Sequence, residues 1–152
     1  MAPETIKKPK KTLKIIIIAV SIIIIVGIIC FSVYLISVKK YQDEVSAITF
    51  FNIDITQIEN GTYTGEYDVG FIYAKVDVII EDGEIIVINL LEHKNERGTA
   101  AEKILDKIIE NQSVEVDAIA QATNSSRVIK KAVEEALMSG VLKKTLSAPP
   151  EG

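Results

Sequence analysis

A run of small and hydroxyl-bearing residues stands directly before an amphipathic helical pattern near the C-terminus. It reads Asp117-Ala118-Ile119-Ala120-Gln121-Ala122-Thr123-Asn124-Ser125-Ser126. Unpaired backbone N–H groups and the positive end of the helix dipole make the first turn of a helix an anion site. One interpretation is a phosphate near Asn124, Ser125 and Ser126, with Arg127 adding a positive charge. The other is an ordinary capped helix, because Ser and Asn are common N-cap residues.

Few other residues offer chemistry. His93 is the only histidine, and the only cysteine, Cys30, lies in a long apolar stretch. One histidine without cysteine partners disfavours a transition-metal site in the C-terminal part of the chain. The residues around His93 do not show the serine and carboxylate pattern of a catalytic triad. The sequence therefore predicts neither metal ligands nor catalytic residues.

The apolar stretch predicts a membrane anchor. Residues 15–38 are 24 positions without Asp, Glu, Lys, Arg or His, and as a helix they rise about 36 Å, enough for roughly 30 Å of hydrocarbon. The stretch is too long for a cleaved signal peptide and ends in bulky residues, so an uncleaved signal anchor is expected. Five lysines precede it, and two lysines, Lys39 and Lys40, directly follow it. The positive-inside rule then predicts a single-pass protein of the cell membrane, with a cytoplasmic N-terminus and an extracytoplasmic C-terminal domain.

The distribution of charge excludes one class of partner. The chain of 152 residues has a net charge of −4, and residues 1–14 alone carry +4, which leaves −8 for the rest. Beyond the leader no basic surface remains for DNA or RNA, so nucleic acid is not expected as a partner.

The outer part predicts one small α+β domain. Alternating and β-branched residues from Gly61 to Leu91 predict a three-stranded antiparallel meander, with Asp82-Gly83 at a tight hairpin turn. Helical spacing follows over 101–111 and again from Ser125 or Ser126 to Ser139, where Gly140 suits the position after a helix. Strands first and helices later favour the α+β class. The expected organisation is a basic leader, a transmembrane helix, a stalk and lead-in, the domain and a flexible tail: 1–14, 15–38, 39–59, 60–140 and 141–152.

Three short motifs within the domain resemble the FMN-binding domain family, which includes the C and G subunits of sodium-pumping NADH:quinone reductase and Rnf electron-transfer complexes. Gly61-Thr62-Tyr63-Thr64-Gly65 is similar to the family's opening strand. Asp82-Gly83-Glu84-Ile85, followed by Leu91-Glu92-His93, is similar to its hairpin and next loop. Asp117-Ala118-Ile119 with Ala122-Thr123 is similar to its flavinylation motif.

The resemblance implies a membrane-anchored electron carrier, an electron-transfer subunit rather than a stand-alone enzyme. In that family a flavin transferase moves FMN from FAD onto the motif threonine, which makes Thr123 the expected acceptor of a phosphoester. A membrane electron-transfer partner is also implied. Besides Thr123, the residues expected to bind FMN are Asp117, Gln121, Ala122, Asn124, Ser125, Ser126, His93, Gly98 and Thr99.

Two positions depart from the family motif. Ala120 stands where the family has Ser or Thr, and Gln121 stands where it has Gly. Because Gln adopts a positive φ less readily than Gly, a loop of different shape is expected. The alternative function is therefore a membrane-tethered binding or assembly module of the same fold that has lost covalent flavin.

Overall fold

The computed structural model describes residues 10–94 and 99–147. The chain divides into two compact units between Lys40 and Tyr41. Helix α1 (Lys10–Ala47) contains the predicted apolar run. It is the one helix in the described ranges that is long and apolar enough to cross a membrane. We expected a stalk from residue 39, but α1 continues to Ala47. Residues 39–47 contain no Pro or Gly to interrupt it.

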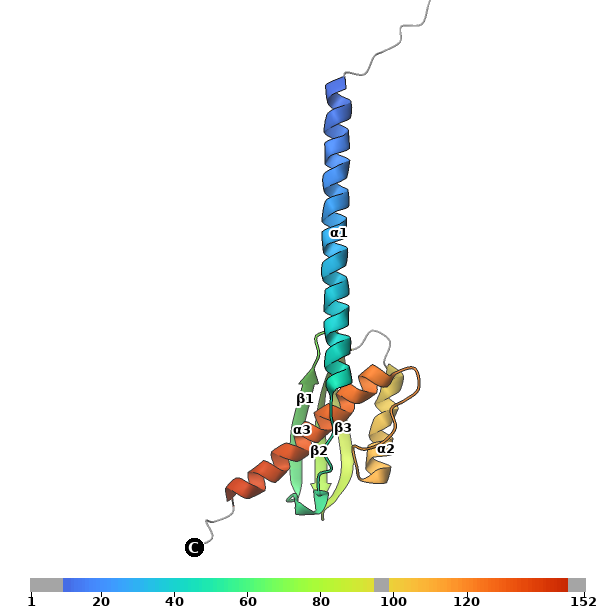
Figure 1. The fold of residues 1–152 in the computed structure, drawn as a ribbon. Coiled ribbons are helices and arrows are strands. Elements are labelled where there is room, and N and C mark those ends of the chain that lie inside the picture. Colours follow the sequence, from blue (N-terminus) through green and yellow to red (C-terminus); the bar gives the residue numbers. More distant parts are fainter. Residues whose placement is uncertain (1–9, 95–98, 148–152) are drawn as a thin grey trace, which may run out of the picture. The chain divides into compact units, whose positions relative to one another are not determined.

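The outer unit contains the predicted meander (Figure 1). Its three antiparallel strands lie in the order β1-β2-β3. They are β1 (Gly61–Asp68), β2 (Tyr73–Glu81) and β3 (Glu84–Lys94). Asp82 and Gly83 connect β2 to β3 with φ angles of 53° and 79°, the positive pair that the expected hairpin turn requires.

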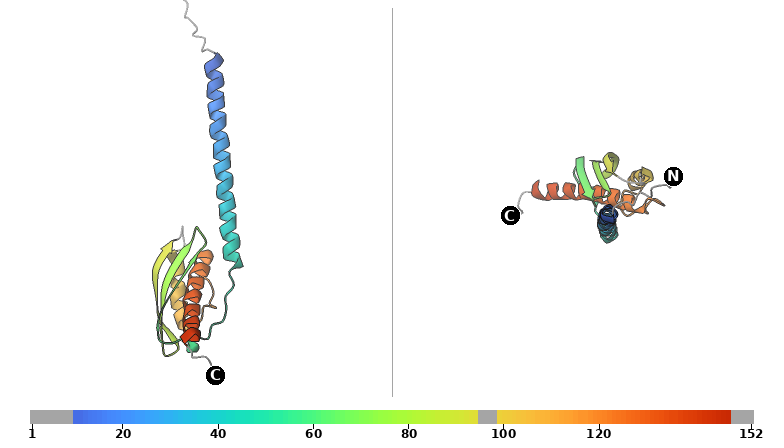
Figure 2. Two further views of the ribbon diagram at one scale, coloured as in Figure 1. Left: turned by 90° about the vertical axis from the view of Figure 1, so that its left-hand side faces the viewer. Right: turned by 90° about the horizontal axis from the view of Figure 1, so that it is seen from above.

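Helices cover one face of this sheet, and the two views of Figure 2 show them against it. They are η1 (Ile55–Gln57), η2 (Thr99–Lys103), α2 (Ile104–Asn111) and α3 (Thr123–Ser147). Helix α3 packs on β1 and β2, and α2 packs on β3. The predicted α+β fold is confirmed.

The core lies between α3 and the sheet. Alternate residues of β2 face it, and the predicted apolar stripe of α3 meets them. The completely buried members are Ala74, Val76, Val78, Ile80, Val128, Ile129, Ala132, Val133 and Ala136. A two-residue period on the strand and a 3.6-residue period on the helix therefore produced one contiguous core.

Helix α3 is longer than its sequence pattern indicated. It begins at Thr123, before the expected Ser125 or Ser126, and it passes through Gly140 to Ser147. Gly140 is buried inside the helix, and a Cβ there would lie 2.6 Å from Ile58 Cγ2 and 3.1 Å from Tyr63 Cε1. The glycine therefore makes room for the packing of Ile58 and Tyr63 and does not end the helix. Part of the expected tail, residues 141–147, is helical.

Candidate functional site

The first turn of α3 lies at a defined end of the outer domain. Gly140, near the C-terminal end of α3, packs on Tyr63, whereas Gly65 approaches Ala132, closer to the helix start. Strand β1 therefore runs toward the N-terminal end of α3. The β1–β2 turn and the N-terminal end of α3, which begins at Thr123, consequently lie at the same end of the domain (Figure 1).

A tight turn leads into α3. Ala122 N donates to Ile119 O at 3.0 Å, and Gln121, the third residue of this turn, has a φ of 64°. The chain thus has at Gln121 the left-handed conformation that glycine adopts most readily. We expected the loop to differ in shape because of this residue, but Gln121 adopts the positive φ itself.

The first turn of α3 has backbone N–H groups that precede the first hydrogen bond of the helix. Thr123 is exposed and is the first helical residue, and Ala122 before it has no side-chain oxygen to serve as an N-cap. Ser126 N donates to Ala122 O at 2.9 Å as the first bond of the helix ladder. The N–H groups of residues 123–125 precede that bond, in the positions that bind phosphate at helix N-termini. An anionic group on the Thr123 hydroxyl fits this geometry.

The two expected serines do not face solvent. Ser125 and Ser126 are buried, 5% and 0% exposed, and Ser126 Oγ accepts a hydrogen bond from Ile119 N at 3.0 Å. Ser126 therefore holds residues 116–122, which we call the motif loop, against α3, and it does not face solvent.

The remaining expected site residues are spread over two regions. Asp117 and Gln121 are exposed, Asn124 is half-buried and Ala122 is buried, all in or beside the motif loop. Thr99 is exposed at the start of η2, which packs on α3.

A further expected residue, His93, lies near the end of β3. The His93 side chain is only 3% exposed, and its Nδ1 lies 3.1 Å from Glu102 Oε1. The His93 side chain is therefore buried, and the residue lies in strand β3 and not in the loop after it. Gly98 lies outside the described residues.

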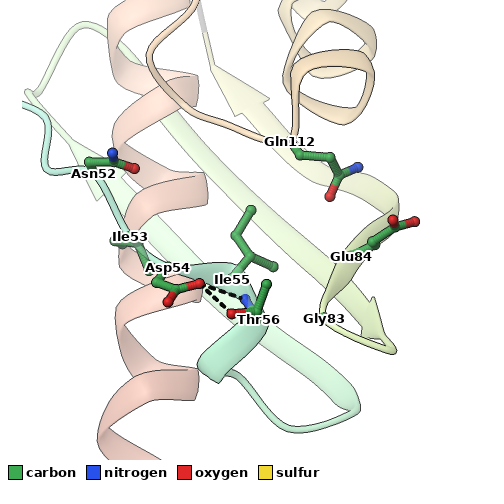
Figure 3. Close-up of a pocket in the computed structure, with 8 residues that line it drawn as sticks. All are labelled: Asn52, Ile53, Asp54, Ile55, Thr56, Gly83, Glu84 and Gln112. Atoms are coloured by element: carbon green, nitrogen blue, oxygen red, sulfur yellow. Dashed lines mark hydrogen bonds between the residues drawn. The ribbon is translucent and has the colours of Figure 1, made fainter.

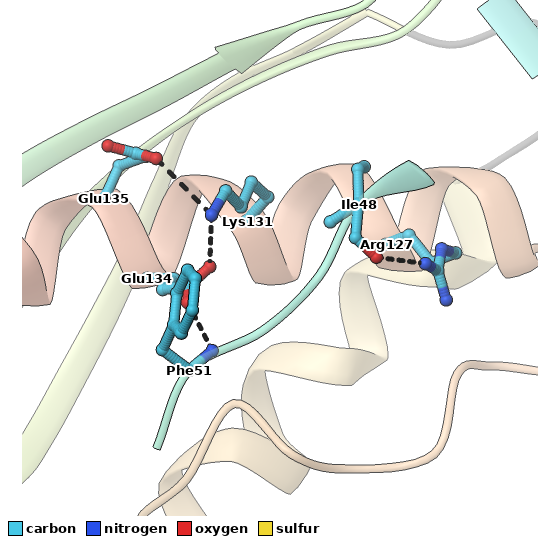
Figure 4. A network of polar contacts seen from close by, with 6 residues as sticks. All are labelled: Ile48, Phe51, Arg127, Lys131, Glu134 and Glu135. Atoms are coloured by element: carbon cyan, nitrogen blue, oxygen red, sulfur yellow. Dashed lines mark hydrogen bonds and ion pairs between the residues drawn. The ribbon is translucent and has the colours of Figure 1, made fainter. Parts of the chain in front are cut away.

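Sequence reasoning missed a buried polar network on α3 that holds residues 45–51 (Figure 4). Arg127 donates to the carbonyls of Val45 and Ile48, the first through Nε at 3.0 Å. Glu134 is fully buried, and its carboxylate accepts from Phe51 N at 2.6 Å and lies 2.7 Å from Lys131 Nζ. The only signal for this network was the apolar character of residues 48–51 just after the anchor.

Lys130 connects this network to the motif loop. Its Nζ donates to Val116 O at 2.6 Å and lies 4.2 Å from the centre of the Phe50 ring. Burial lowers the pKa of Lys130, and the charge of Arg127 lowers it further. For Lys131, burial also acts to lower the pKa, but the bonds to Glu134 and Glu135 outweigh it and the pKa is raised. The motif loop is thus fixed by Lys130 as well as by Ser126.

The described residues form pockets away from Thr123. One is about 490 Å³, lies at the β2–β3 turn and is lined by residues that include Asp54, Glu84 and Gln112 (Figure 3). A second, about 380 Å³, lies between α2 and the motif loop and includes Asp117. Its lining is mostly charged, with Lys107, Glu110 and Glu115, which suits a polar group better than an apolar ring.

Residues 69–138 match the model of the FMN-binding domain family. The chain carries an FMN-binding domain. The match covers β2, β3, α2, the motif loop and the packed part of α3, so the suspected family is confirmed and FMN is the cofactor that this family supports. Together with α1, the FMN-binding domain makes this a membrane-anchored FMN-binding protein.

The conformation of Gln121 leads to a stability prediction. We expect Gln121→Gly to stabilise the domain by about 0.5–1 kcal/mol, because relief of the left-handed strain exceeds the extra flexibility of the unfolded chain. Gln121→Ala keeps the Cβ and should show no such gain. Denaturant unfolding of the full chain in detergent measures both, and equal midpoints for Gly and Ala would contradict the strain argument.

The buried carboxylate leads to a second prediction. Glu134→Ala should destabilise the domain by about 3 kcal/mol, because Phe51 N and Lys131 lose a buried partner. Glu134→Gln keeps an acceptor for Phe51 N and should lose less. Glu135→Ala, at a half-exposed neighbour, is the matched control and should stay within about 1 kcal/mol of wild type. Equal losses at positions 134 and 135 would refute the role of the network.

Proposed function

We propose that this protein carries electrons on the outer face of the cell membrane through an FMN attached to Thr123 by a phosphoester. The observation that supports this most is the position of Thr123: it is exposed, it begins α3, and it follows a turn in which Gln121, at the place of the motif glycine, has a positive φ. FMN, when bound, supplies reversible electron transfer. The protein supplies the anchor, the attachment point and the fixed loop around it.

The attachment itself needs a transferase and FAD. The Thr123 Oγ forms a bond to the phosphorus of the FMN half, the bond between that phosphorus and the AMP oxygen breaks, and AMP leaves. The hydroxyl proton passes to a base of the transferase. The N–H groups of the first turn of α3 then lie beside the new phosphodiester, where they stabilise its negative charge.

The extracytoplasmic side is part of the proposal. It is supported by the five lysines before the anchor and the two after it. One test is whether an added protease reaches the domain in intact spheroplasts. Cleavage of the domain is expected there, and full protection until lysis would place the domain in the cytoplasm.

The test of the cofactor is co-expression of the full chain with a flavin transferase, followed by denaturing electrophoresis. Flavin fluorescence should stay with the protein band. A dark band from a protein that still binds added FMN would indicate a non-covalent flavoprotein. A dark band without FMN binding would instead favour the binding or assembly module.

A further inference from the structure

The β1–β2 turn has one aromatic residue, Phe71, at its tip. Val69 and Ile72 are buried, 5% and 7% exposed, and Val69 N donates to Ile72 O at 3.0 Å. Between them Gly70 has a φ of 80°, and its N–H donates to Asp68 Oδ1 at 2.7 Å. This fixed turn leaves Phe71 half-buried at its tip.

Phe71 packs on the last part of α1. Its ring centre lies 5.1 Å from that of Tyr41, with the planes inclined by 50°. Tyr41 is also half-buried, so neither residue is fully covered within the domain. We call Tyr41, Phe71 and residues 69–72 the aromatic end of the domain.

The aromatic end is close to the membrane by chain length alone. Val38 is the last residue of the uncharged run, and Tyr41 follows it by three residues. Three residues span at most about 11 Å even when fully extended, whatever the angle between helix and domain. The headgroup region is some 5–8 Å thick on each side of the hydrocarbon, and aromatic side chains are enriched there.

We propose that the aromatic end is a lipid-contacting surface, seated in the headgroup region of the membrane that holds α1. Its continuity with the membrane-spanning segment identifies the occupant as phospholipid. This inference does not depend on FMN. The β1–β2 turn and the start of α3 lie at the same end of the domain. If FMN is attached to Thr123 as proposed above, it would therefore lie at the membrane side of the domain.

The charges around the aromatic end indicate what holds it there. Three lysines are balanced by three carboxylates in the surrounding segments: Lys39, Lys40, Lys94, Asp43, Glu44 and Asp68. Without an excess of positive charge, anionic lipid is not required, and the aromatic rings themselves supply the affinity. Contact with zwitterionic lipid, insensitive to salt, is therefore expected.

The chain contains no tryptophan, so Phe71→Trp creates a single fluorescent reporter. The full-length variant is reconstituted in phosphatidylcholine vesicles that carry bromine on the shallow part of the acyl chains. Tryptophan emission should be lost relative to unbrominated vesicles, equally at low and high salt. Leu146→Trp is the matched control, because Leu146 is apolar, 86% exposed and at the other end of α3, and its emission should not change.

Several results would overturn the proposal. These are unchanged emission from Phe71→Trp, equal quenching of both variants, and quenching that disappears at high salt. Circular dichroism checks that each variant is folded. If Phe71→Trp does not fold, Tyr41→Trp reports on the same surface with the same expected loss.

Discussion

Thr123→Ala, co-expressed with a flavin transferase, should yield a full-length protein without any flavin fluorescence on a denaturing gel. The reason is chemical, because alanine has no oxygen to bond to the FMN phosphorus. The exposed position of Thr123 at the first turn of α3 means that the substitution removes the acceptor with little change in packing. The expected loss of covalent flavin is complete.

Two controls make this result specific. Thr123→Ser keeps a hydroxyl at the same place and should retain fluorescence, although at a lower level. Ser125→Ala removes a buried hydroxyl two residues away and should leave the modification in place. Fluorescence that persists in Thr123→Ala would assign the attachment to another residue.

Gly65→Ala should destabilise the domain by about 3 kcal/mol or more. An added Cβ would lie 2.1 Å from Ala132 O and 2.4 Å from Ala136 N. Both are backbone atoms of α3, so no side-chain rotation relieves the overlap and the helix must move away from the sheet. Because this contact holds α3 on β1, the loss should spread through the core.

Gly61→Ala is the matched control on the same strand. A Cβ at Gly61 would lie 3.6 Å from the nearest atoms of the Tyr63 ring, which is ordinary contact, so the change should stay within about 1 kcal/mol. Denaturant unfolding of the full chain in detergent compares the two. Equal midpoints for Gly61→Ala and Gly65→Ala would contradict the close approach of β1 and α3.

The parts of the fold that depend on local chemistry were predictable. The uncharged run predicted the long apolar helix α1, and Asp82-Gly83 predicted the hairpin turn with both φ angles positive. The helical spacing from Val128 to Leu137 gave the buried stripe of α3. Each of these follows from a pattern within a few neighbouring residues.

The parts that depend on distant contacts were not predictable. Gly140 reads as a helix stop until Ile58 and Tyr63 are seen to pack where its side chain would be. Glu134 reads as a solvated helix residue until residues 48–51 are seen to cover it. Both cases require knowledge of what another segment of the chain places against the helix.

The candidate site divides in the same way. Residue types and order suggested the motif loop and Thr123 as the place of attachment, whereas the burial of the Ser126 and His93 side chains depends on tertiary packing. Gln121 is intermediate, because its residue type argued against the φ of 64° that it adopts. Ser126 Oγ accepts from Ile119 N and Lys130 Nζ donates to Val116 O, so contacts on both sides fix the loop in which this conformation occurs.

Mass spectrometry of the tryptic peptide 108–127, from full-length protein co-expressed with a flavin transferase, tests the central claim most directly. Thr123 is the single threonine in this peptide. The peptide should gain the mass of one FMN less one water, and fragmentation should place the addition on Thr123. An unmodified peptide, or an addition located on Ser113, Ser125 or Ser126, would contradict it.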